Sequence, residues 1–473
     1  MIAEIVHILS QWESIDTGIV VTAALAAMAC AVPGTYLLLR RQSMMGDALS
    51  HTVLPGIVLA FLLTHWIKSS GWISLETYKA TEHAAMFLGA IAVGVLTALL
   101  TEWVQKLGRV ESTAALGVVY TTLFAAGLLL IRIAADSVHL DPDCVLYGNL
   151  ELSVLDVGMT VADIEIPRPE LVSGAMFLVN MFLIVLFFKE LRISAFDPSL
   201  ATTLGIHASL MHYALMGVTA ATVVAAFESV GSILVIAMLI VPSATAHLLT
   251  DRLSTMIFLS LLIAALSALL GHIFALTLPP IVFGRLGFDS VRDAGTAGMM
   301  AAACGLLFVL AMLFGPRHGV LSKLIDQSRL SLKIAGEDML GLLFRLEESA
   351  NLQDQTLAAA PRLSGHVQGV GPILSRLALF KLQWGGKIAG RASEYSLTDL
   401  GRKDAKALVR AHRLWESYMA RHFDVPDDHL HETASRVEHF LDPDLRAELS
   451  AELDRPRRDP HGRDIPDDYN AGS

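Results

Sequence analysis

The chain has few cysteines, few charged residues and no nucleotide-binding motif. Its three cysteines, Cys30, Cys144 and Cys304, are too few and too scattered for a disulfide framework or a thiolate metal site. No Gly-x-x-x-x-Gly-Lys-Ser/Thr phosphate loop occurs, so we do not expect this chain to hydrolyse ATP by itself. The first sixteen residues contain no Lys or Arg, which argues against a cleaved signal peptide and predicts that the first apolar run is retained.

Long apolar runs dominate the first two thirds of the chain. Of all residues 53% are hydrophobic and 17% are charged, but a boundary lies near Gly315, after which no stretch is long enough to cross a bilayer. The runs before it predict an all-α polytopic membrane protein with eight or nine transmembrane helices, depending on whether a break at Glu228 separates two of them. The runs are 17–39, 44–66, 83–104, 113–133, 171–188, 211–227, 230–249, 256–278 and 294–314.

Basic residues recur at alternate ends of these runs and predict an orientation. They are Arg40, Arg41, Lys106, Arg109, Lys189, Arg192, Arg252 and Arg317. Because cytoplasmic loops are enriched in Lys and Arg, these ends and the polar tail after Arg317 are predicted to be cytoplasmic, with segments 67–82 and 134–168 outside. The exceptions leave the side of the amino terminus open, and they are Arg132, Arg285 and Arg292.

Asp47 and His51 form an ionisable pair inside the second apolar run. A carboxylate at bilayer depth costs roughly 2.5–3.5 kcal/mol on insertion scales, which makes a functional role the first hypothesis. Residues four apart on a helix share one face, so the pair can offer two ligands to one metal ion on a transport path. The alternative is a buried pair that only fixes helix packing.

Other polar residues in the apolar part are weaker candidates for metal binding than Asp47 and His51. Glu228 is a second candidate for the transport path, with a purely structural role as the alternative. A turn after the fourth run gathers three further donors that form either a metal loop or an ordinary solvated edge, namely His139, Asp141 and Asp143. His247, near the end of the seventh run, is expected to face solvent or a partner chain.

Three strings in this part resemble the membrane permeases of ABC importers for manganese, zinc and iron. They are residues 38–51, 140–148 and 227–242, and the resemblance covers roughly residues 10–320. It implies a homodimer in the lipid of a bacterial inner membrane, with a cytoplasmic ATPase subunit on each half and an extracytoplasmic metal-binding lipoprotein. It also implies that Asp47 and His51 line the metal route.

The same resemblance implies a docking segment for the ATPase after Pro242, through His247 to Arg252. The ligand chemistry narrows the transported ion without choosing it, because carboxylate plus imidazole without thiolate suits Mn²⁺, Fe²⁺ or Zn²⁺ and disfavours Cu⁺.

The polar tail shows the element order of a winged helix. Residues 336–349 and 371–383 have helical apolar spacing, and a glycine-rich stretch of short strand-like pieces follows at 385–398. A long helix is then predicted to begin near Asp399. Helix, helix, small β wing and helix is the order of a winged-helix domain.

Histidine and glutamate recur at helical spacing in the last part of the tail. His412 and Glu416 are four apart on one predicted helix. A further helix is predicted to carry a second stripe, consisting of His431, Ser435, Glu438 and His439. Two helices that present five imidazole or carboxylate donors predict a metal site, and the alternative is two solvated faces with local ion pairs.

These strings resemble the metal-binding and dimerisation domain of the diphtheria-toxin-repressor family, and residues 330–403 resemble its winged helix. By this resemblance the metal ligands are His412, Glu416, His431, Glu438, His439 and, on the first tail helix, Asp338. Ser435 departs from the family, which has Cys or Glu at that position. The expected domains are a permease (1–318), a linker (319–335), a winged helix (336–403) and a metal-binding and dimerisation domain (404–473).

Charge argues against DNA binding by the tail. Residues 320–473 contain 21 Lys and Arg against 24 Asp and Glu, a net charge of −3, whereas DNA readers carry a basic footprint. The expected reading helix offers only Arg376 and Lys381 as cations. We therefore expect a divalent-metal permease with a fused cytoplasmic metal sensor that feeds back on transport. The alternatives are a membrane-tethered metal-dependent transcriptional regulator and a tail that is only a structural dimerisation module.

Overall fold

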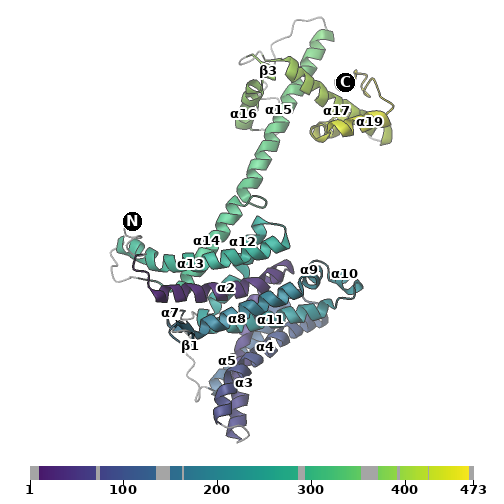
Figure 1. Ribbon diagram of the computed structural model, residues 1–473. Coiled ribbons are helices and arrows are strands. Elements are labelled where there is room, and N and C mark those ends of the chain that lie inside the picture. Colours follow the sequence, from purple (N-terminus) through teal and green to yellow (C-terminus); the bar gives the residue numbers. More distant parts are fainter. Residues whose placement is uncertain are drawn as a thin grey trace. The chain divides into compact units, whose positions relative to one another are not determined.

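The computed structural model describes residues 10–70, 75–134, 150–161, 164–285, 293–352, 371–390, 395–423 and 426–467 (Figure 1). The chain divides into two compact units, Met1–Ser322 and Lys323–Ser473.

The first unit is helical apart from one small antiparallel hairpin. Its long helices are α2 (Ser14–Leu39), α3 (Ser43–Ser69), α4 (Leu75–Gly108), α5 (Ser112–Ala134), α8 (Arg168–Leu186), α11 (Ala208–Val230), α12 (Ser232–Leu249), α13 (Leu253–Arg285) and α14 (Thr296–Phe314). The shorter elements are α7 (Leu150–Ser153), the hairpin of β1 (Val157–Val161) and β2 (Ile164–Pro167), α9 (Phe188–Phe196) and α10 (Pro198–Thr203).

The break near Glu228 is real, and it separates two helices. Gly231 lies between α11 and α12 with a φ of 79°, a left-handed value that residues with a side chain rarely adopt. Among the described residues, eight helices are long and apolar enough to span a membrane, and α12 contributes a shorter apolar helix over Ile233–Leu249. The eight long helices and the shorter α12 together account for the prediction of eight or nine transmembrane helices.

Helix α2 is the centre of the first unit, and small residues let its neighbours approach closely. A Cβ added at Gly34 would lie 1.8 Å from the backbone oxygen of Leu239 on α12. The buried hydroxyl of Thr35 lies 3.0 Å from that of Ser243, and Asn180 on α8 donates to the carbonyl oxygen of Ala29 over 2.9 Å. Close backbones and interhelical hydrogen bonds are what hold helices together in lipid, where hydrophobic burial contributes little between them.

Basic residues from several helix ends gather at one end of the first unit. Arg40 lies 3.1 Å from His212 and donates to the carbonyl oxygen of Ser194 over 3.2 Å. Lys106 and Arg109 line the same cavity of about 890 Å³ as Arg40. Leu38 and Leu39 pack in one cluster with Leu249 and Met256, so the turn between α12 and α13 lies at this end too. Arg317 forms an ion pair with Asp251 in that turn.

The second unit contains the elements predicted for the tail. They are α15 (Val320–Leu352), α16 (Pro372–Trp384), the antiparallel strands β3 (Ile388–Ala389) and β4 (Ser396–Leu397), α17 (Asp399–His422), α18 (Asp427–Val437), the 3-10 helix η2 (Glu438–Phe440) and α19 (Pro443–Glu452). Residues 320–335, assigned to a linker from the sequence, form the first half of α15.

Local sequence explains where these elements begin and how they pack. Helix α17 begins where predicted, because the Thr398 hydroxyl accepts a hydrogen bond from the amide of Gly401 over 3.1 Å, as N-cap residues do. The core of this unit joins α15, α16, the β pair and α17 through nine buried apolar residues: Ala335, Met339, Leu340, Leu343, Ala378, Leu382, Ile388, Leu397 and Ala405.

Candidate functional site

The tail brings His412, Glu416 and His431 together, and we call this group site A. Nε2 of His412 lies 2.9 Å from Oε1 of Glu416 and 2.8 Å from Nδ1 of His431, and the last two atoms are 3.1 Å apart. His412 and Glu416 lie one turn apart on α17 and are buried, whereas His431 reaches them from α18 and stays exposed. Three donor atoms from two helices therefore converge on one point.

The other nitrogen of His412 is held by Glu438. Nδ1 of His412 forms a hydrogen bond with Oε2 of Glu438, which fixes the ring so that Nε2 faces Glu416. A histidine ligand whose second nitrogen is held by a carboxylate is the usual arrangement around protein-bound metals. Burial lowers the pKa of His412, but the hydrogen bonds with Glu416 and Glu438 outweigh burial and raise it above its ordinary value. Two carboxylates thus favour positive charge at His412.

The pKa of Glu416 shows the same attraction from the carboxylate side. Burial raises its pKa, but hydrogen bonds and charge from His412 and His431 outweigh burial and lower it to about 2. The carboxylate is therefore ionised over the whole physiological range and is available to a cation.

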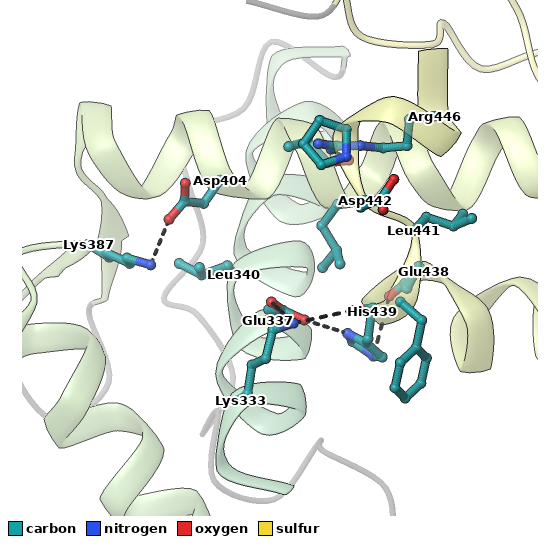
Figure 2. A pocket seen from close by; sticks show the side chains of 14 residues that line it. Lys333, Glu337, Leu340, Lys387, Asp404, Glu438, His439, Leu441, Asp442 and Arg446 are labelled. Atoms are coloured by element: carbon teal, nitrogen blue, oxygen red, sulfur yellow. Dashed lines mark hydrogen bonds and ion pairs between the residues drawn. The ribbon is translucent and has the colours of Figure 1, made fainter. Parts of the chain in front are cut away.

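Asp338, Glu438 and His439 form a second group of donors, which we call site B. Figure 2 shows Glu438 and His439 of this group. Nε2 of His439 lies 3.2 Å from Oδ1 of Asp338 and 4.0 Å from Oε1 of Glu438. Nδ1 of His439 lies 2.9 Å from Oε2 of Glu337. Burial lowers the pKa of His439, but hydrogen bonds with Asp338 and Glu337 outweigh burial and raise it to about 9.

Glu337 was missed in the sequence, although it is adjacent to Asp338. Its carboxylate contacts the Nδ1 of His439, whereas Asp338 lies near the Nε2 of the same ring. Figure 2 shows the Glu337 and His439 pair. It has the position of an outer partner that orients a ligand. The resemblance gave one residue on this helix, and only the packing of α15 against η2 shows that its neighbour also reaches the site.

One detail of the predicted second stripe is wrong. Helix α18 ends at Val437, and Glu438 and His439 lie in the tighter 3-10 turn that follows. In this turn Glu438 contacts both His412 and His439, so it belongs to both groups. The hydroxyl of Ser435 donates to the carbonyl oxygen of Glu432 over 2.9 Å.

The donor sets fit divalent metal ions, and the two sites differ in chemistry. Site A offers two imidazoles and one carboxylate, and site B offers one imidazole and two carboxylates. Imidazole suits zinc, copper, iron and nickel, whereas carboxylate suits manganese. When bound, the ion would supply the positive charge that these buried acids attract.

In the first unit Asp47 and His51 face each other along α3. Nε2 of His51 lies 3.6 Å from Oδ1 of Asp47, and the side chains are 34% and 40% exposed. The His51 ring stacks on Tyr120 at 6.1 Å and meets Phe124 edge-on at 5.4 Å, both on α5. Within the described part of the chain, no third carboxylate, imidazole or thiolate completes a three-ligand group here.

The remaining predicted residues fall into two groups. The first group lies outside the described residues and consists of His139, Asp141, Asp143 and the side chain of Glu228. Pro242 is buried inside α12, whereas His247 and Arg252 are exposed at its end and in the turn that follows, with the His247 ring stacked on His318 at 6.1 Å. A buried Pro242 leaves only the later part of the predicted docking segment accessible.

Comparison with known proteins agrees with the resemblances found in the membrane part and in the tail. Residues 11–282 match the ABC 3 transport family, and residues 398–467 match the iron dependent repressor, metal binding and dimerisation domain. The manganese transport system membrane protein MntD of Bacillus subtilis is 39% identical over 68% of this chain and 100% of its own length. A probable metal transport system membrane protein of Chlamydia trachomatis is 26% identical over 94% of both chains.

A solved structure agrees with the fold of the first unit. PsaBC from Streptococcus pneumoniae in complex with Fab matches 67% of this chain and 98% of its own with 28% identity and a TM-score of 0.50. The class is therefore that of metal ABC transporter permeases, and this chain belongs to the ABC 3 transport family. It is in particular a permease fused to an iron dependent repressor metal-binding and dimerisation domain.

Proposed function

We propose that this chain imports a divalent transition metal, Mn²⁺, Fe²⁺ or Zn²⁺, as the permease subunit of an ABC transporter whose fused tail senses the imported metal. The observation that carries the transport role is the Asp47 and His51 pair, half-exposed on one face of a helix in a family of metal permeases. Carboxylate and imidazole are ligands that all three ions accept. A metal-binding protein outside the membrane delivers the ion.

The number of donors in this pair supports a homodimer. Two ligands from one chain leave most of an ion's coordination positions to other donors, and a second copy would supply another Asp47 and His51. Most homo-oligomers are two-fold symmetric, so equivalent residues face one another across the axis. In this proposal the ion crosses between the two copies.

The basic end of the first unit supports the orientation. Arg40, Lys106 and Arg109 line one cavity, and Arg317, just before α15, pairs with a turn at that same end. Since Lys and Arg accumulate on the cytoplasmic side, this end faces the cytoplasm and the tail emerges there. The ATPase subunit docks at this end, where the segment from His247 to Arg252 is accessible.

Helix α10 belongs to this docking end as well. Its amino terminus is capped by Asp197, whose carboxylate accepts from the amides of Ser199 and Leu200 over 3.0 and 2.9 Å. Leu200 and Leu204 are exposed beside the basic cavity that Pro198 and Thr202 help to line. We include this capped helix in the proposed ATPase interface, which the sequence had placed only after Pro242.

The metal-sensing tail supports feedback on transport. When cytoplasmic metal is plentiful, the ion fills the tail sites and biases the transporter toward a resting state. Reciprocity then requires the resting state to bind the sensed metal more tightly than the active state does.

Removal of the tail tests this proposal. Proteoliposomes with the permease, the ATPase and ATP should take up metal at a rate that falls as internal metal is raised, and a chain ending at residue 319 should take up metal without that fall. Equal inhibition with and without the tail would contradict feedback. Failure of both forms to take up metal in the presence of the delivery protein would contradict the transport role.

The rival function is a membrane-tethered transcriptional regulator, and DNA binding separates it from ours. The expected reading helix α16 exposes a stripe of large apolar side chains, Ile373, Leu377, Phe380 and Trp384, beside only two cations. We expect the full chain in nanodiscs, with metal, to bind duplex DNA weakly and without sequence preference at physiological salt, as measured by fluorescence anisotropy. A metal-dependent, sequence-specific complex of nanomolar strength would favour the regulator.

A further inference from the structure

His461 lies on a tight turn that the tail folds over site A. In residues 459–462 the amide of Gly462 donates to the carbonyl oxygen of Asp459 over 3.0 Å, and Gly462 has a φ of 79°. Pro460 at the second position fixes the φ that such a turn needs. The Asp459 carboxylate accepts from the amide of Arg463 over 2.7 Å. His461 is therefore presented at the tip of a defined turn.

The turn is fastened to α17 on both sides. Asp459 is buried and lies 3.7 Å from Nε of the buried Arg413, and Arg413 also donates to the carbonyl oxygen of Asp464. Ile465 packs in a buried cluster with Leu414. These anchors lie next to His412 in the sequence of α17, so the turn is held directly above site A.

His461 faces the donors of site A across one cavity. Its Nε2 lies 3.9 Å from Oε1 of Glu416. A cavity of about 340 Å³ is lined by His412, Glu416, His431 and His461 together with Arg345, Arg413, Asp459 and Arg463. The separation of 3.9 Å is too long for a hydrogen bond. It is within the reach of two ligands on one ion, because metal–nitrogen and metal–oxygen bonds are each about 2.0–2.2 Å long.

We propose that His461 is the fourth protein ligand of site A. This inference rests on the proposed metal-sensing role of the tail and names the donor that the predicted set lacked. Site A then offers three imidazoles and one carboxylate, which favours Zn²⁺ over Mn²⁺. Site B keeps two carboxylates and one imidazole and favours Mn²⁺ or Fe²⁺. In this proposal the tail binds one class of ion at site A and another at site B.

Two of the three arginines that line the cavity, Arg413 and Arg345, have carboxylate partners that compensate their charges. Arg413 pairs with Glu348 over 3.0 Å and with Asp459, and Arg345 lies 3.7 Å from Glu438. The alternative is that His461, whose side chain is 38% exposed, is a surface histidine without a ligand role.

Zn²⁺ binding by the full chain in nanodiscs tests the assignment. His51→Ala and Asp338→Ala are introduced first, so that the permease pair and site B do not compete, and Zn²⁺ and Mn²⁺ affinities are measured against a chelating dye. His461→Ala should weaken Zn²⁺ binding at least about tenfold, since even outer partners of metal ligands contribute 10–100-fold. Mn²⁺ binding should change less. His461→Glu, which keeps four donors, should shift the preference from Zn²⁺ toward Mn²⁺.

His422→Ala is the matched control. His422 is also 38% exposed and lies 3.5 Å from Glu452, but it does not line the cavity, so its removal should leave both affinities unchanged. X-ray absorption at the zinc edge should count one imidazole fewer after His461→Ala.

Two results are decisive. Zn²⁺ affinity that is lost with His412→Ala but retained with His461→Ala overturns the fourth ligand and leaves the sensor in place. Zn²⁺ affinity that survives His412→Ala overturns the sensor site itself, and the fourth ligand with it.

Discussion

Asp47→Ala or His51→Ala is expected to abolish ATP-dependent metal uptake while the chain stays in the membrane with its ATPase partner. Each change removes a ligand from a pair whose atoms lie 3.6 Å apart and which has no third carboxylate, imidazole or thiolate donor beside it among the described residues. In the proposed dimer each substitution removes two ligands, one from each copy. An ion must exchange its hydration shell for protein donors to cross, so we expect uptake to fall to the background of vesicles without ATP.

The control for this prediction lies on the same helix. His65 is exposed near the end of α3 and its ring stacks on Phe61 at 6.0 Å. His65→Ala should therefore transport normally, with uptake followed by a radioactive ion or a metal-sensitive dye inside the vesicles. Uptake at the unaltered rate in the Asp47 or His51 variant would remove the pair from the transport path and leave it a role in helix packing.

Replacing Glu438 and His439 together by Ala is expected to remove metal binding at both tail sites. Glu438 holds the Nδ1 of His412 in site A and lies 4.0 Å from His439 in site B, so its loss disturbs both. His439 is the imidazole of site B. We expect metal affinity of the tail to fall at least about a hundredfold, since single outer partners already contribute 10–100-fold and here direct ligands are lost. Calorimetry would show the loss.

The same double variant should also relieve inhibition of transport. Uptake at high internal metal should rise to the level of the tail-free chain, and uptake at low internal metal should be unaltered. Glu432→Ala is the matched control, because Glu432 lies on α18 and pairs with Arg436 over 2.7 Å outside both sites. If uptake responds to internal metal identically in wild type and double variant, feedback is wrong and the tail is a structural dimerisation module.

Much of the membrane unit is readable from the sequence, for a physical reason. A spanning helix needs about 20 apolar residues, because it must satisfy its backbone hydrogen bonds internally across the hydrocarbon. Each spanning helix can therefore be recognised from its own apolar run, without knowledge of the rest of the fold. The number of spans was ambiguous near Glu228, since a break of a few residues can either separate two helices or interrupt one, and only the backbone shows that Gly231 ends α11 and that the shorter α12 begins after it.

In the tail, the sequence predicted the metal-donor residues better than it predicted the ends of the helices. Helical spacing placed His412 and Glu416 on one face, and the structure brings them within 2.9 Å. It did not show that α15 begins at Val320 or that α18 ends at Val437, because helix ends depend on capping and packing as much as on apolar period.

The sequence by itself determined the two-part architecture, the family and most of the candidate ligands, because apolar period, charge placement and motif strings are local properties of the chain. Only the tertiary structure decided which donors share a site. Glu337 reaches His439 from a helix 102 residues away in sequence, and Glu438 joins two sites because a 3-10 turn redirects it. His461 reaches Glu416 because buried Arg413 and Asp459 fasten a distant turn over α17. Contacts between segments remote in sequence depend on packing, which no local pattern records.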